Sequence, residues 1–143
     1  MIPRRLFLAS AILAFFALAD TGNASEPPIL ATGTFRDGDP VHRGSGELRI
    51  TDSSPPSGLR QLGMLDMKIV SGPNLRVYLV REPDSLFPED VTAGFQDLGP
   101  LQSLTGDQTY AIPADIRLAE WGSVVVWCDT FKTAFAIATL VRR

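Results

Sequence analysis

The sequence has 143 residues, a formal net charge of −3 and a single cysteine. This length suits one domain, and the excess of acidic residues excludes the basic surface that nucleic-acid binding requires. One cysteine also excludes an internal disulfide framework. The sequence therefore predicts one domain with no nucleic-acid partner. Its thiol is buried, bound to a ligand or open to another thiol.

The N-terminus has the pattern of an export signal. Arg4 and Arg5 precede the uncharged segment 6–19, which matches the basic start and short apolar stretch of a signal peptide. We predict a signal peptide over residues 1–19, with cleavage at residue 24 as the alternative, followed by a lead-in over residues 20–32. We expect no stable membrane insertion after signal removal, because no other apolar run is long enough to span a bilayer.

The paired arginines also resemble the twin-arginine export signal. Pro3 and Ala9 stand where that signal has its usual flanking residues, so the general secretory (Sec) route is favoured over the twin-arginine route. Either route leads out of the cytoplasm, and the protein is expected to be periplasmic or secreted.

Short strands separated by Gly- and Pro-rich turns dominate the mature chain. Strands are predicted over residues 29–36, 47–50, 59–64, 67–70, 75–80 and 108–112, and two more within 123–140. The Ser71-Gly72-Pro73-Asn74 cluster predicts a hairpin between the strands on either side of it, because Pro restricts φ. The fold class is therefore all-β, as an antiparallel β-sandwich or flattened barrel of about eight short strands.

Two segments have a different composition. Residues 81–107 contain three prolines and six acidic residues, which predicts a long connection with at most one short strand or helical turn around 91–98. Residues 114–120 are expected to form one helical turn. Such a long connection is typically functional or mobile.

The last stretch of the chain contains the cysteine. Residues 124–128 are apolar and rich in β-branched side chains, and a second apolar run follows Asp129 and Thr130, which predicts two buried strands joined by a short turn. Because side chains alternate along a strand, residues 124, 126 and 128 share one face and residues 125 and 127 share the other. Both faces are apolar, so two-sided burial is expected.

Several stretches, in this order, resemble one family. They are Gly33-Thr34-Phe35, Gly72-Pro73-Asn74-Leu75, the segment from Gly106 to Pro113, and Trp127-Cys128-Asp129-Thr130-Phe131. The chain is similar to the DM thirteen domain, also called the electron-transfer DM domain, which is found next to DOMON domains in Skeletor-like proteins. The resemblance covers residues 33–141 as a single domain and suggests a stand-alone, bacterial-type exported member.

The resemblance implies a β-sandwich-type extracytoplasmic module with one family cysteine, corresponding to Cys128, for which a redox role has been proposed. Family members often stand beside cytochrome-like or DOMON modules that supply an electron partner. No such neighbour occurs within these 143 residues. The expected partner is therefore a separate redox protein or a surface ligand.

Cys128 and His42 are the candidate redox or ligand residues. Asp129 disfavours a thiolate at Cys128, so this cysteine is either structural and buried or carries or ligates a redox centre. His42 follows a turn cluster and is either a loop histidine or a ligand. If the fold joins the two, they can bind haem iron or copper, with Met64 or Met67 as weaker candidates for a soft ligand.

No cofactor is assigned from the sequence. Copper requires a second nitrogen ligand that one histidine does not supply, and the chain has no Cys-x-x-Cys-His haem attachment. Three aromatic residues are expected to support the site. Trp127 and Phe131 are predicted to lie in the core, and Tyr110 is predicted to line a groove with Trp121.

Two functions follow from these patterns. The first is an exported redox-associated or electron-transfer module in which the lone cysteine carries or ligates the centre. The alternative is a non-enzymatic extracytoplasmic binding or surface-interaction β-sandwich, with a structural buried cysteine and a binding loop over 82–108. The sequence has none of the common hydrolase or phosphate-binding motifs, so a stand-alone enzyme is not expected.

Overall fold

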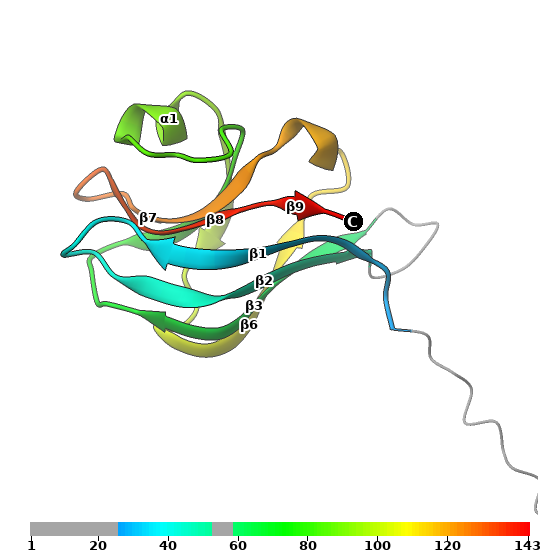
Figure 1. Cartoon of the computed structure of the whole chain (residues 1–143), viewed down its shortest axis with the longest axis horizontal. Helices are drawn as coiled ribbons and strands as arrows, with labels where there is room; N and C mark the ends of the chain where they lie inside the picture. Colours follow the sequence, from blue (N-terminus) through cyan, green and yellow to red (C-terminus); the bar gives the residue numbers. More distant parts are fainter. Residues whose placement is uncertain (1–25, 53–58) are drawn as a thin grey trace, which may run out of the picture.

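The computed structural model describes residues 26–52 and 59–143 (Figure 1). The predicted signal peptide and residues 53–58 lie outside the described residues. The strands are β1 (Ile29–Asp37), β2 (Gly44–Asp52), β3 (Arg60–Ile69), β4 (Leu75–Val80), β5 (Phe95–Pro100), β6 (Thr105–Ile112), β7 (Ser123–Cys128), β8 (Thr133–Thr139) and β9 (Val141–Arg142). Two short helices, α1 (Pro88–Thr92) and the 3₁₀ turn η1 (Leu118–Glu120), complete the fold.

The strands form one antiparallel sheet that closes almost completely on itself. Their order is β5-β4-β7-β8-β1-β2-β3-β6, and β9 pairs with β1. The outermost strands β5 and β6 contact each other, so the sheet curls into a nearly closed barrel (Figure 1). The predicted all-β class and the flattened-barrel architecture are confirmed.

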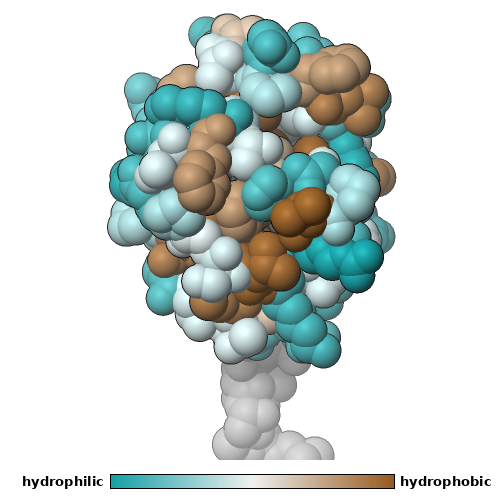
Figure 2. Space-filling model, turned by 90° about the vertical axis from the view of Figure 1, so that its left-hand side faces the viewer, coloured by the Kyte–Doolittle hydropathy of each residue, from teal (hydrophilic) through white to brown (hydrophobic). Residues whose placement is uncertain are grey.

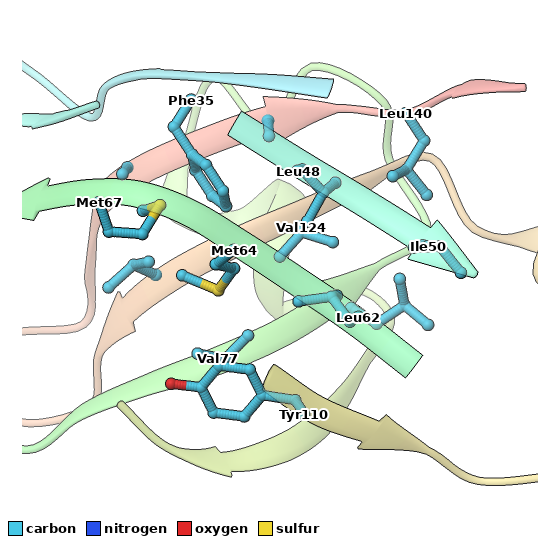
Figure 3. Packing of buried hydrophobic residues seen from close by; sticks show 14 of the residues in the cluster. Phe35, Leu48, Ile50, Leu62, Met64, Met67, Val77, Tyr110, Val124 and Leu140 are labelled. Carbon is cyan, nitrogen blue, oxygen red and sulfur yellow. The ribbon is translucent and has the colours of Figure 1, made fainter. Parts of the chain in front are cut away.

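The barrel interior is filled by apolar side chains from most of the strands. Ile50, Leu62, Met64, Val77 and Val124 point toward one another there, and all are almost fully shielded from solvent (Figure 3). This interior is the principal core, because burial of apolar surface is the main favourable contribution to folding.

A second, smaller core covers the outer face of β4, β7 and β8. It contains Tyr78, Val80, Val91, Val125, Trp127 and Ile137. Val91 belongs to α1, so this helix shields the outer face of the sheet. The predicted alternation in β7 is confirmed, because Val124, Val126 and Cys128 belong to the interior core while Val125 and Trp127 belong to the outer one.

A β-bulge in β3 directs both of its methionines inward. Met64 and Met67 are three residues apart, so strict alternation would point one of them outward. The pairing of β3 with β6 shifts between these two residues, and Asp66 has a positive φ of 51° within the shift. The backbone N–H of Asp66 donates to Asp107 Oδ1 at 2.8 Å, which holds the bulge in place.

The hairpin predicted at residues 71–74 is wrong. β3 pairs with β2 and β6, whereas β4 pairs with β5 and β7. Both edges of β3 are therefore occupied, and its neighbour in sequence has to join another part of the sheet. The turn cluster is real, but it carries the chain across one end of the barrel.

The prediction of at most one element within 81–107 is also wrong, because this segment contains both α1 and β5. Pro88 begins α1, where its missing N–H costs nothing, and Asp90 Oδ2 accepts a hydrogen bond from the Phe87 N–H at 2.9 Å. β5 then extends the sheet along the free edge of β4. Neither element has enough periodicity to be recognised locally.

Candidate functional site

Cys128 lies at the end of β7, at the end of the barrel where the β1–β2, β3–β4 and β7–β8 turns meet. Its side chain is completely shielded from solvent. The thiol donates to the Pro73 carbonyl at 3.0 Å, and the sulfur accepts a hydrogen bond from the Phe131 N–H at 3.4 Å. The cysteine thereby connects the β3–β4 turn to the β7–β8 turn.

Two further hydrogen bonds reinforce this connection. The Asp129 N–H donates to the Asn74 carbonyl at 3.1 Å, and Asn74 Nδ2 donates to Asp129 Oδ2 at 3.4 Å. Asn74 adopts a left-handed conformation with φ of 50°, which Asn tolerates better than most residues. The two turns are thus fastened by backbone and side-chain contacts together.

Asp129 is held as a carboxylate. Its pKa is lowered, chiefly by the hydrogen bond from Lys132 at 2.6 Å, and the Trp127 side chain adds a weaker contribution of the same sign. Lys132, the nearest cation in sequence to Cys128, is therefore occupied by Asp129. Because the thiol uses its proton to reach the Pro73 carbonyl, this arrangement suits a neutral thiol better than a nucleophilic thiolate.

His42 lies in the β1–β2 turn at the same end of the barrel. Its Nδ1 is 2.5 Å from Asp39 Oδ2, and its backbone N–H donates to Asp39 Oδ1 at 2.7 Å. The hydrogen bond from the His42 side chain is the main reason that the pKa of Asp39 falls from 3.8 to about 2. Asp39 therefore orients the imidazole and organises the turn.

Phe135 contacts both candidate regions. Its ring centroid is 4.4 Å from that of His42. The ring also packs against Gly72, where an added Cβ would lie 2.5 Å from two ring carbons. Pro73, whose carbonyl accepts the hydrogen bond from the Cys128 thiol, follows Gly72 directly. Within residues 26–52 and 59–143, no hydrogen bond joins His42 to Cys128, so the fold brings them to one end of the barrel without pairing them.

Met64 and Met67 belong to the interior core, and the Met67 sulfur packs over Gly46, which has a positive φ of 141°. Among the described residues, no group of three His, Cys, Asp or Glu side chains has a geometry that holds a metal ion. The haem or copper ligand set of His42, Cys128 and a methionine stays a prediction.

The aromatic residues lie differently from what we expected. Phe131 is 60% exposed at the tip of the β7–β8 turn, so its placement in the core is wrong. Tyr110 and Trp121 are buried and do not line an open groove together. The Tyr110 hydroxyl donates to Gln108 Oε1 at 2.6 Å and accepts from the Gln102 N–H at 2.9 Å, so Tyr110 anchors the loop before β6.

Trp127 is buried, as predicted, and it belongs to an aromatic row on the outer face of the sheet. Tyr78 stacks on Phe95 with a centroid distance of 4.4 Å and on Trp127 at 6.0 Å. Burial raises the pKa of Tyr78. Sequence reasoning missed Tyr78 and Phe95, because only the pairing of β4 with both β5 and β7 brings the three rings together.

Four exposed apolar side chains surround the end of the barrel that contains Cys128. They are Val41, Val70, Leu104 and Phe131, and we call them the turn face. Hydrogen bonds from Val70 to Arg43 and from Ile69 to Leu104 bring three of these segments side by side. Figure 2 shows this end, where apolar side chains gather among hydrophilic ones.

A groove of about 510 Å³ lies beside the turn face, between the start of β2 and the end of β3. Asp37, Arg43, Lys68 and Val70 are among the residues that border it, so its rim carries charges of both signs beside apolar surface. Val41 and Phe131 are the most exposed members of the turn face, at 76% and 60%. Exposed apolar groups clustered with a polar rim are typical of protein contact sites.

A protein-family model described as "Electron transfer DM13" matches residues 34–140. No curated protein and no solved structure matches the chain. Within the described part of the chain, none of the helices has the length and apolar character needed to cross a membrane.

Proposed function

The chain belongs to the electron-transfer DM13 family, which indicates a redox-related role, and on that basis we propose that it is an exported, non-enzymatic module that docks a separate redox protein through its turn face. In this proposal Cys128 is a structural thiol that fastens the turns beneath the docking surface. Export is supported by the basic and apolar N-terminal pattern.

The environment of Cys128 carries this proposal. Thiol exchange and oxidation both require a thiolate that solvent or a partner can reach. Here the sulfur has no exposed surface, and its donor and acceptor capacities are both used within the protein. A group with these contacts supports a fold rather than reacting at a surface.

The turn face supports the docking part of the proposal. Phe131 stands on the hairpin tip, where its own N–H donates to the Cys128 sulfur and the nearby Asp129 N–H donates to the Asn74 carbonyl. An exposed aromatic side chain on a rigid support is a typical anchor in protein interfaces, because little conformational entropy is lost when it is buried. The partner is expected to carry its own haem, flavin or metal centre.

Site-specific photo-crosslinking of the exported protein tests the docking proposal. A photoreactive amino acid replaces Phe131 in one variant and Gln61, an exposed residue of β3 outside the turn face, in the control. We expect a defined adduct from position 131 only, and its purified form should show the visible absorption of a redox cofactor. Equal adducts from both positions, or a partner without a redox centre, would refute the proposal.

The second candidate is that Cys128 itself carries or ligates the redox centre. It is favoured by one feature, namely that the sulfur lies directly beneath the exposed hairpin tip, so that a local opening of residues 129–132 uncovers it. Voltammetry of the folded protein and of Cys128→Ser distinguishes the two. A couple that is lost in Cys128→Ser would establish this second function, whereas the docking proposal predicts no cysteine-dependent couple.

A further inference from the structure

A second groove lies at the end of the barrel opposite the turn face, where β9 and η1 are found (Figure 1). It has a volume of about 480 Å³ and is lined mainly by Arg60, Arg117, Arg142, Arg143, Leu30 and Leu118. We call it the arginine groove. It contains four of the 13 Lys and Arg residues of a chain whose net charge is −3.

None of these four arginines forms an ion pair within the described residues, although Arg76, Arg81 and Lys132 each do. Among the residues that the structure describes, no acidic side chain lines the groove. The nearest carboxylates along the backbone belong to Asp52, which faces Arg60 in the β2–β3 register, and to Asp115. The groove is therefore a concentrated positive site in an acidic protein.

Backbone carbonyls hold two of the guanidinium groups in position. Arg60 Nη1 donates to the Ile116 carbonyl at 2.5 Å, and Arg142 Nη2 donates to the carbonyls of Leu118 and Trp121 at 2.8 and 2.6 Å. Each contact uses one terminal nitrogen, so the other N–H groups of these forks are left for a ligand. A guanidinium that is fixed in advance loses less entropy when it binds a carboxylate or phosphate.

The hydrogen bonds to backbone carbonyls give Arg60 and Arg142 a structural role, because they support the loop around η1. Arg117 has no such role. Arg117 is exposed, and within residues 26–52 and 59–143 its side chain has no hydrogen bond or ion pair. It nevertheless lines the same groove as the two anchored guanidinium groups. Leu30 and Leu118 add an apolar wall beside this charge, and both are half-buried.

We propose that the arginine groove binds an amphiphilic anion, with a phosphate or carboxylate head at Arg60, Arg117 and Arg142 and an apolar body against Leu30 and Leu118. Guanidinium forks match the geometry of both head groups, and the apolar wall adds affinity that a bare inorganic ion does not gain. The proposal uses no residue of the turn face and does not depend on the docking function.

Calorimetric titration of the mature protein with hexyl phosphate and with inorganic phosphate tests this proposal. We expect hexyl phosphate to bind at least tenfold more tightly than inorganic phosphate, and to bind more weakly as salt increases. Arg117→Gln should lower the affinity roughly tenfold, since it removes a charge-assisted contact without removing a bond that holds the fold. Arg49→Gln, which removes an exposed arginine that lines neither this groove nor the one beside the turn face, is the matched control.

Vesicles distinguish the two sources of such an anion. Sedimentation with phosphatidylglycerol vesicles, but not with phosphatidylcholine vesicles, and competition by hexyl phosphate would identify a lipid head group. Binding of hexyl phosphate without vesicle binding would identify a soluble anion. The proposal is overturned if neither probe binds at millimolar concentration, or if Arg117→Gln and Arg49→Gln bind hexyl phosphate equally well.

Discussion

Replacing Cys128 by alanine should weaken the fold by about 2 kcal/mol. The substitution removes a sulfur with no exposed surface, which costs about 1 kcal/mol of lost burial for a group of this size. It also removes two hydrogen bonds, to the Pro73 carbonyl and from the Phe131 N–H, which together contribute about 1 kcal/mol because both turns lie near solvent that can replace them.

Urea denaturation of the wild-type protein and of Cys128→Ala measures this loss, and Phe131→Ala is the matched control. The control removes an exposed side chain of the same turn while keeping its backbone N–H, so its stability should change by less than roughly 0.5 kcal/mol. Hydrogen exchange adds a local readout. The Asp129 N–H, which donates to Asn74, should exchange faster in Cys128→Ala, because the two turns then share fewer contacts.

A change below about 0.5 kcal/mol in Cys128→Ala, with unaltered exchange at Asp129, would refute this reasoning. The sulfur would then contribute nothing to the connection between the turns. The structural role of Cys128 would lose its support, and the cysteine-centred redox function would become the stronger of the two.

Three other predictions follow from the turns and the N-terminus. The pKa of Asp39 is lowered from 3.8 to about 2, chiefly by the hydrogen bonds that its carboxylate accepts from His42. The stability that this carboxylate contributes is therefore complete above pH 4 and is lost as the pH falls toward 2. Asp39→Asn should abolish this part of the pH dependence in denaturation experiments. Gly38→Ala should destabilise the protein by more than about 2 kcal/mol, because the new Cβ would lie 1.9 Å from a carbonyl oxygen of β8. Gly63→Ala is the control and should change stability by less than about 1 kcal/mol, since the closest atom to its new Cβ is 3.7 Å away. Equal losses of stability in thermal unfolding would contradict this contrast. Replacing both signal arginines by lysine should leave export intact if the Sec route is used, and immunoblots of cell fractions that show retention inside the cell would instead indicate the twin-arginine route.

Local sequence patterns were sufficient for the fold class and for the composition of β7. The alternation of residues 124–128 predicts which side chains face the interior and which face the outer core, because successive side chains of a strand point to opposite faces whatever the strand pairs with. The turn after Cys128 was also predictable, because a tight turn depends on residues that are next to one another in the chain.

The site itself was only partly predictable. Cys128 and His42 were identified by residue type, but their partners depend on the fold. The thiol bonds to Pro73, 55 residues earlier in the chain, and His42 packs on Phe135 instead of meeting the sulfur. No local pattern contains such contacts.

What the sequence by itself determined is that this chain forms short antiparallel strands with an apolar, two-sided β7 and one cysteine that has no disulfide partner within the chain. Only the tertiary structure decided that β4 leaves β3 to pair with β5 and β7, that Phe131 lies at the surface, and that four arginines share one groove. The physical reason is that strand direction and side-chain alternation are local properties. Which edges pair depends on closing the whole barrel around one core.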